Sequence, residues 1–133
     1  MCGDKWNIEG GMLNLDNEVL EAIITAEKYM DNIRNGIELI VNNYRGGNYY
    51  KAKEYMKDLV EGLVWLNEVL TYTKSYHSIN PLELSSVFNE MVIAFENSDT
   101  VMLADLLEYE VLPIIEAWQS KLKKEVNSYV HWI

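Results

Sequence analysis

The chain has 133 residues, of which 49% are hydrophobic and 24% are charged, a composition typical of one globular domain. Its 21 acidic and 11 basic residues give a formal net charge of −10, which argues against nucleic acids and anionic membranes as partners because their phosphates would be repelled. The single cysteine, Cys2, excludes an intramolecular disulfide framework. Neither a membrane-spanning apolar run nor a signal-peptide pattern is visible, so we expect a cytoplasmic protein.

The first sixteen residues contain three glycines and no helical periodicity. We therefore expect residues 1–16 to form an N-terminal arm and residues 17–130 to form the domain. Glu9-Gly10-Gly11 directly precedes Met12, and codons for these three residues can spell a bacterial ribosome-binding sequence. This pattern indicates Met12 as the natural start, with residues 1–11 outside the natural protein.

Two long amphipathic helices are predicted over residues 17–45 and 49–75, because apolar residues recur there at alternating spacings of four and three. Gly46 and Gly47 supply the left-handed stop that helix ends favour, and so short a loop makes the two helices antiparallel neighbours. The expected core residues are Val19, Ile23, Ala26, Met30, Ile33, Ile37, Ile40 and Tyr44 in the first helix, and Ala52, Met56, Leu59, Leu63, Leu66, Leu70 and Thr73 in the second.

A third helix is predicted to begin at Asn80-Pro81-Leu82-Glu83, with the asparagine as N-cap and the glutamate reaching back to it. Asn97-Ser98-Asp99 ends this helix and caps a fourth, which runs to about residue 128. Pro113 lies inside the fourth helix, where its ring clashes with the carbonyl of Tyr109 and predicts a bend. The expected core residues are Leu84, Phe88, Met91 and Phe95 in the third helix, and Ala104, Leu107, Val111, Ile114 and Trp118 in the fourth.

The expected fold is all-α, an antiparallel four-helix bundle built from two helical hairpins, with long first, second and fourth helices and a shorter third helix. At 1.5 Å per residue the third helix spans about 24 Å, whereas the others are nearly twice as long. Along part of the bundle the apolar core is therefore left without a fourth helix to cover it. The arm, the end of the fourth helix or an amphipathic helix of another protein fills this gap.

The pattern of polar residues indicates no catalysis, cofactor or metal site. A di-iron bundle needs Glu-x-x-His on two helices, but Lys74 stands three residues before His77, and Ser128 three before His131. We expect both histidines to be solvated or to pack at helix ends. Gly46-Gly47 is too short to cradle a phosphate. The sequence thus predicts a protein that is not an enzyme.

Between residues 75 and 120 the chain has eight acidic residues and no lysine or arginine. Helical spacing predicts an outer stripe on the fourth helix that consists of Asp105, Glu108, Leu112 and Glu116. This stripe is either a solvated face that keeps the protein soluble or a dock for a basic helix or tail.

A second surface is predicted on the outer side of the second helix, where the heptad spacing places Val64, Trp65 and Tyr72. Tryptophan and tyrosine combine a large apolar area with few rotatable bonds, which is typical of interface hot spots. The alternative is that the N-terminal arm folds back and covers this surface with Trp6 and Ile8.

The order of these features resembles the flagellin export chaperone family, small acidic helical bundles that hold a segment of flagellin before secretion. The likeness covers about residues 20–122 and includes the stretch Gly47–Glu54, the leucine-rich run Leu59–Leu70 and a last helix that closes on Ala117-Trp118. The Asn-Pro-Tyr opening of that family is absent, and Pro113 interrupts its usually continuous last helix. The resemblance implies a bundle that binds a client and assigns no specific residue.

We therefore expect a non-enzymatic, protein-binding bundle, a chaperone or adaptor that holds an amphipathic helical segment of a client. The rival hypothesis is an acidic immunity protein or antitoxin that neutralises a basic partner through the carboxylate stripe. A homodimer is a further arrangement that either surface would allow.

Overall fold

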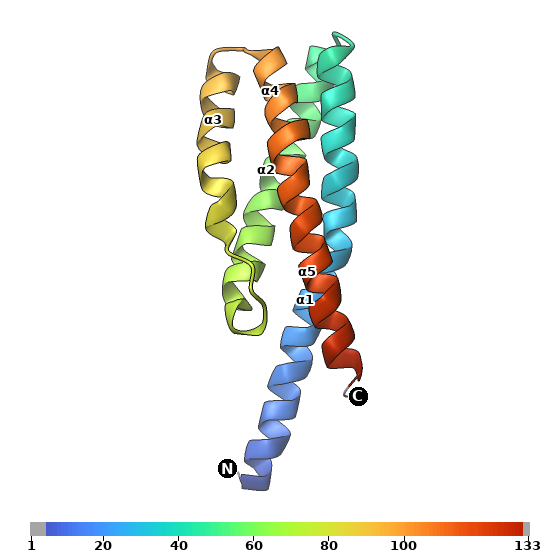
Figure 1. The fold of residues 1–133 in the computed structure, drawn as a ribbon, viewed down its shortest axis with the longest axis vertical. Coiled ribbons are helices and arrows are strands. Elements are labelled where there is room, and N and C mark those ends of the chain that lie inside the picture. Colours follow the sequence, from blue (N-terminus) through green and yellow to red (C-terminus); the bar gives the residue numbers. More distant parts are fainter. Residues whose placement is uncertain (1–4, 132–133) are drawn as a thin grey trace.

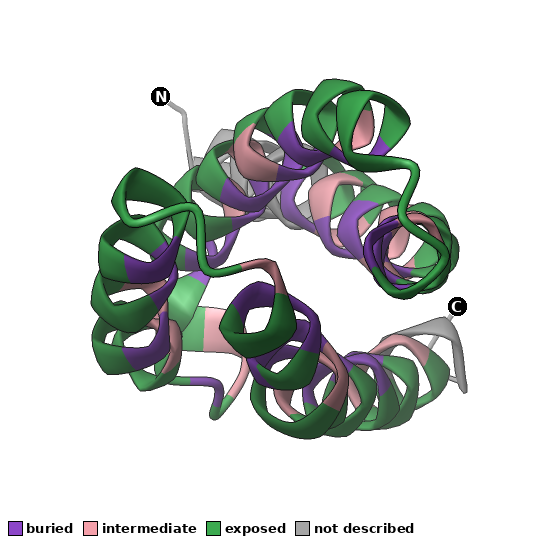
Figure 2. Ribbon diagram, turned by 90° about the horizontal axis from the view of Figure 1, so that it is seen from above, coloured by how far each residue is buried: buried purple, intermediate pink, exposed green. Residues whose placement is uncertain are grey.

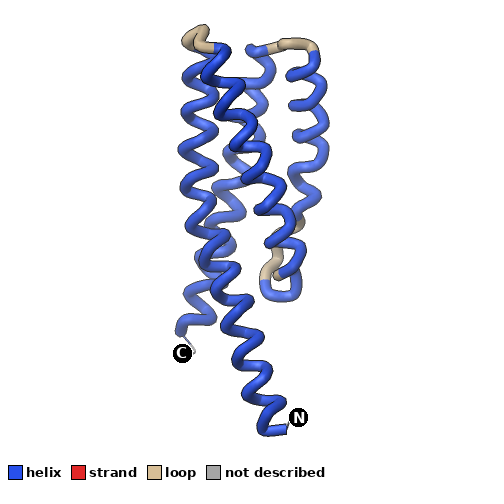
Figure 3. The backbone as a smooth tube through the Cα atoms, turned by 180° about the vertical axis from the view of Figure 1, so that it is seen from behind, coloured by secondary structure: helices blue, strands red, loops and turns tan. Residues whose placement is uncertain are grey.

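The structure is a computed structural model that describes the backbone of residues 5–131 and the side chains of residues 17–128. The described chain contains no strand, so the predicted all-α class is confirmed (Figure 1 and Figure 3). In chain order the elements are α1 (Lys5–Arg45), α2 (Tyr49–Tyr72), the 3-10 turns η1 (Lys74–Tyr76) and η2 (Pro81–Leu84), α3 (Ser85–Glu96), α4 (Thr100–Leu106), the π-helical turn η3 (Leu107–Val111) and α5 (Leu112–His131).

The helices alternate in direction along the chain, so that α1 and α3 run one way and α2 and α4–α5 the other (Figure 1). Ring contacts between α1 and α2 follow the same register, since Tyr29 meets Trp65 and Tyr44 meets Tyr49. Gly47, in the turn between these helices, has a φ of +82°, the left-handed conformation predicted for the helix stop. The antiparallel bundle of two hairpins is thus present, with a shorter α3 as predicted.

The expected core of the first two helices is confirmed in full, because every residue predicted for it is buried. Buried residues lie on the inner sides of the helices, and exposed residues lie on the outer sides (Figure 2). α1 makes close contacts with α2, α4 and α5, so its apolar stripe is shared between two walls of the bundle. This helix is therefore the centre of the packing.

The expected core of the later helices is partly wrong. α3 buries Val87, Met91 and Ala94, whereas Phe95 is 45% exposed. In α5 the expected core residue Ile114 is only half-buried, and its neighbour Ile115 is buried. The π-helical turn before α5 holds more residues per turn than an α-helix, which accounts for the move from Ile114 to Ile115, while Trp118 is buried as predicted.

Pro113 disturbs the helix in the turn that precedes it. Its nitrogen has no hydrogen to donate, and its ring would clash with the carbonyl of Tyr109 in a regular helix. The segment Leu107–Val111 widens into the π-helical turn, and the helix then continues as α5. The irregularity predicted near Tyr109 therefore takes the form of a widened turn within a continuous helical rod.

α1 begins at Lys5 and not near residue 17, so the expectation of a non-helical arm is wrong for the backbone of residues 5–16. An existing helix can be extended without a new nucleation step, since each added residue gains one hydrogen bond. This segment extends beyond the end of the bundle (Figure 1). The side chains of Trp6 and Ile8 lie outside the described residues, and a start at Met12 stays a prediction.

Two glycines inside helices provide a matched test of the α1–α2 contact. A Cβ atom added at Gly62 would lie 2.6 Å from the hydroxyl oxygen of Tyr29, whereas one at Gly36 would meet nothing within 4 Å. We predict that Gly36→Ala raises the free energy of unfolding by about 0.5–1 kcal/mol, because alanine loses less backbone entropy. Gly62→Ala is expected to lower it by about 1 kcal/mol, because the ring of Tyr29 must move away from Trp65.

Urea denaturation followed by circular dichroism measures both changes. Equal stabilisation by the two substitutions would contradict the close approach of α1 and α2 at Gly62.

Candidate protein-binding groove

The side of the bundle between α2 and α3 is open. α3 makes close contacts with α4, but α2 approaches the second hairpin mainly through the short η2 turn. The resulting groove has a volume of about 550 Å³ and is lined by Lys53, Met56, Lys57, Val60 and Glu61 of α2 and by Phe88, Met91, Val92, Phe95 and Glu96 of α3. The sequence predicted an opening beyond the end of a short helix, whereas the opening lies along its length.

The groove continues past Phe88 toward the base of the bundle. A second hollow of about 370 Å³ lies there, between Leu63 and Val64 of α2 and Pro81 and Leu84 of the second hairpin. Together the two hollows follow the whole length of α3.

The apolar stripe predicted to face the core from α3 also lines this groove, with Met91 buried, Leu84 and Phe88 half-buried and Phe95 exposed. Leu84, Phe88, Met91 and Phe95 are spaced by four, three and four residues, and each lines one of the two hollows. α3 turns its Val87 side toward the interior. The helix thus carries two apolar sides, and within the described chain no helix covers the second one.

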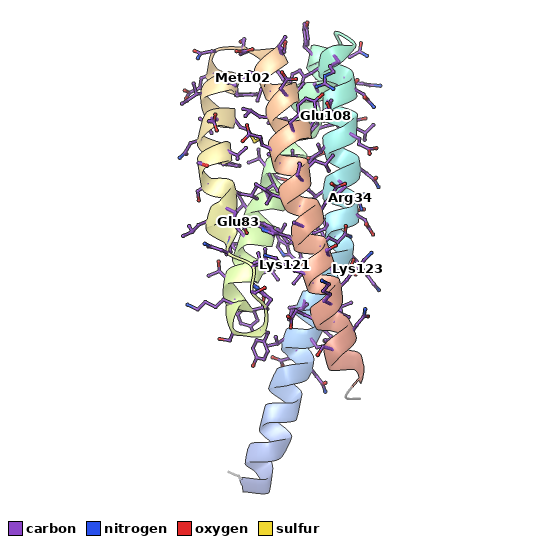
Figure 4. The ribbon with its side chains drawn as sticks, viewed as in Figure 1. Arg34, Glu83, Met102, Glu108, Lys121 and Lys123 are labelled. Atoms are coloured by element: carbon purple, nitrogen blue, oxygen red, sulfur yellow. The ribbon has the colours of Figure 1, made fainter. Side chains whose placement is uncertain are left out.

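A buried side of α5 anchors the base of α3. The indole N–H of Trp118 donates a hydrogen bond of 3.0 Å to Oε1 of Glu83, the acidic residue of η2 (Figure 4). The N-cap at Asn80 is confirmed, because its Oδ1 accepts the N–H of Leu82 at 3.1 Å. The Glu83 side chain was expected to reach back to this cap. It accepts the hydrogen bond from Trp118 and so connects η2, where the second hairpin begins, to α5.

His77 holds the connection between α2 and η2. Its Nδ1 accepts the backbone N–H of Ile79 at 3.1 Å, and its Nε2 lies 3.0 Å from the carbonyl of Leu70 and 3.1 Å from Oγ1 of Thr73. Because Nδ1 accepts a hydrogen bond, the ring is neutral and carries its proton on Nε2. Burial lowers the pKa of His77, while the Leu70 carbonyl acts in the opposite direction. The predicted end-packing of this histidine is confirmed; the side chain of His131 lies outside the described residues.

The upper part of the predicted acidic stripe is paired with α1. Arg45 forms ion pairs with Glu108 and, at 3.0 Å, with Asp105, and its guanidinium also lies 5.9 Å from the ring centre of Tyr109. The hydrogen bond from Arg45 lowers the pKa of the Glu108 carboxyl. These carboxylates therefore lie at the contact between α1 and α4–α5 and are not free (Figure 4).

The lower part of the stripe joins a polar network around a buried glutamine. Glu116 lies 3.5 Å from Nη2 of Arg34, whose Nη1 donates to Oε1 of Gln119 at 3.1 Å. Gln119 is only 4% exposed, and its Nε2 donates to Oδ1 of Asp31 at 2.8 Å. Leu112, predicted to be exposed, is half-buried against the core.

The side chains of Asp105 and Glu116 are exposed, as expected of an outer stripe, and the carboxylates of the stripe are paired with arginines of α1. Arg34 and Arg45 are the only arginines of the chain, and both bind its carboxylates. Gln119 was missed by the sequence analysis. Its position beside Trp118 in the predicted core stripe was the one available signal of a buried polar residue.

The three residues predicted as a hot spot do not form one patch. Val64 is 50% exposed and lines the groove, and Tyr72, at the end of α2, is 63% exposed. Trp65 is about a quarter turn further round the helix than Val64 and is half-buried, and its ring lies 5.0 Å from that of Tyr29 in an edge-on arrangement at 69°. The expectation of an exposed tryptophan is therefore wrong, because this side of α2 packs against α1.

In the part of the chain that the structure describes, no three histidine, cysteine or acidic side chains are grouped so that they could hold a metal ion. No helix in that part is long and apolar enough to cross a membrane.

A family model described as "Domain of unknown function (DUF8042)" matches residues 21–121, which include both walls of the groove and the ion pairs on α1. The match covers more than half of the chain, so the protein belongs to this family. No curated protein and no solved structure shows a significant match.

The geometry of His77 predicts a loss of stability in weak acid. In the unfolded chain His77 has the ordinary histidine pKa of about 6.5, whereas in the folded chain its pKa is lower. The unfolded chain therefore binds more protons in weak acid, and the free energy of unfolding falls as the pH is lowered through about 6.5. Urea denaturation between about pH 7.5 and 5.5 measures this, with His131→Gln as the starting protein so that one histidine remains. His77→Gln in that protein is expected to remove the dependence over this range, and an unchanged slope would contradict the assignment.

Proposed function

We propose that this protein is a protein-binding helical bundle, of the chaperone or adaptor class, that holds an amphipathic helix of a client protein in the groove between α2 and α3. One observation carries the proposal. The α3 stripe of Leu84, Phe88, Met91 and Phe95 has the spacing of a core seam, yet it lines the groove and leaves Phe95 45% exposed. A helix laid against this stripe would supply the missing wall of the bundle.

The exposed apolar area supports binding of useful strength. Phe95 and Val92 are 45% and 43% exposed, and Val64 is 50% exposed. Full burial of one such side chain contributes about 1.5–3 kcal/mol, and half-exposed ones contribute about half of that. Several such contributions together offset the loss of translational freedom and side-chain entropy on association.

The acidic stripe lends less support to the rival hypothesis of an inhibitor of a basic protein. A basic partner would have to displace Arg45 from Asp105 and Glu108, and Arg34 from Glu116. The groove requires no such exchange, because Val64, Val92 and Phe95 in its lining are already exposed. The resemblance to flagellin export chaperones supports the same class of function.

Photo-crosslinking in cells of the source organism tests the proposal. A photoreactive residue replaces Val92 in the groove or, as the matched control, Leu39 on the outer side of α1, which is 46% exposed. We expect residue 92 to crosslink a segment of another protein with apolar residues three or four apart, and residue 39 to give at least about tenfold less. Mass spectrometry of the crosslinked peptides identifies the segment.

Adding Phe95→Asp is expected to remove most of the crosslink at residue 92, with little change in melting temperature. Equal crosslinking from both positions, or crosslinks only to a second copy of this chain, would overturn the proposal.

A further inference from the structure

The two rims of the groove carry opposite charges at one end. Lys53 and Lys57 line the α2 rim, and Glu96 lines the α3 rim. All three lie near the same end of the bundle, because α2 begins there and α3 ends there (Figure 1). Glu61, one turn beyond Lys57, marks the limit of the basic stretch.

The two lysines are unpaired among the described side chains, whose ion pairs all involve Arg34 or Arg45. Lys53 and Lys57 stand four residues apart and therefore project from the same face of α2, an arrangement in which like charges destabilise a helix. The groove lining as a whole carries two lysines and two glutamates, so the positive charge is confined to this part of the α2 rim, in a chain whose net charge is −10. An anionic group from outside the chain would relieve this repulsion.

The groove also limits the size of its occupant. Between the lysines and the base it is lined by apolar side chains such as Val60 and Val64 of α2 and Phe88 of α3. From Lys53 to Asn67 the α2 wall is about 21 Å long at 1.5 Å per residue, which matches a helix of about four turns. The aliphatic stems of the lysines extend this apolar floor while their ammonium groups remain at the rim.

Building on the function proposed above, we infer that the client helix carries acidic residues along the edge that lies against Lys53 and Lys57. Carboxylates spaced by one turn on the client would pair with both lysines, while Glu96 on the α3 rim would repel acidic residues from the other edge. Glu61 would repel acidic residues further along the α2 rim. Because the lysines stand at one end of the groove, such a client would lie in one direction only. The charges would therefore select the client, and the apolar floor would hold it.

Three fluorescent peptides of about 15 residues test the inference with the full chain. All three present the same leucine face and carry glutamates, glutamines or lysines along one edge. Fluorescence anisotropy is expected to show that the glutamate peptide binds about fivefold more tightly than the lysine peptide at low salt, with the difference shrinking toward about 0.5 M salt. The net negative charge of the protein favours the opposite order, so this preference isolates the local effect of the two lysines.

A pair of double variants with the same change in net charge supplies the control. Lys53→Glu with Lys57→Glu is expected to reverse the preference, whereas Lys121→Glu with Lys123→Glu, on α5 away from the groove (Figure 4), leaves it unchanged. All three peptides are expected to lose binding in Phe95→Asp.

The contradicting outcomes separate the two proposals. Equal binding of all three peptides, lost in Phe95→Asp, would overturn the charge preference while leaving groove binding intact. Failure of every peptide to bind would overturn both proposals. A dimer in sedimentation velocity that dissociates on Phe95→Asp would show that a second copy fills the groove, and it would overturn this inference.

Discussion

The packing of α1 against three other helices determines the form of this protein. Its buried stripe from Val19 to Tyr44 contacts α2 on one side and α4–α5 on the other. α3 takes little part in this packing and contacts chiefly α4 and η2. Burial of apolar area holds together the helices that share α1, and no comparable contact draws α3 onto α2. The open groove is a consequence of this unequal distribution of contacts.

Ion pairs between α1 and the α4–α5 segment, away from the groove, support the same arrangement of helices. Both arginines of the chain lie on α1 and bind carboxylates of the α4–α5 segment. Exposed ion pairs contribute only about 0–1 kcal/mol each, so their main effect is on the register and on the neutralisation of a crowded acidic face. The buried Gln119 adds hydrogen bonds to Arg34 and Asp31 at the same contact. The basic residues at the groove are left without such partners among the described side chains.

The two walls of the groove, α2 and α3, are each fixed by contacts outside the groove. α2 is held by α1, where Gly62 permits the close approach of Tyr29. α3 is held at its base by the hydrogen bond between Trp118 and Glu83 and by the neutral ring of His77. None of these contacts uses a residue of the groove floor. The proposed client site can therefore remain exposed while the bundle keeps its stability elsewhere.

Local patterns along the chain predicted the helices, the caps at Asn80 and Asp99, and the whole core of α1 and α2, because helical spacing and capping depend on neighbours within a few residues. They predicted an opening in the bundle, but at the end of the short third helix and not along it. They could not show which apolar side of α3 packs inward, since the Val87 side and the Phe88 side both have helical spacing. The pairing of α1 arginines with the acidic stripe joins residues 60 or more positions apart. Such contacts depend on which helices become neighbours, and that arrangement arises from the packing of the whole chain.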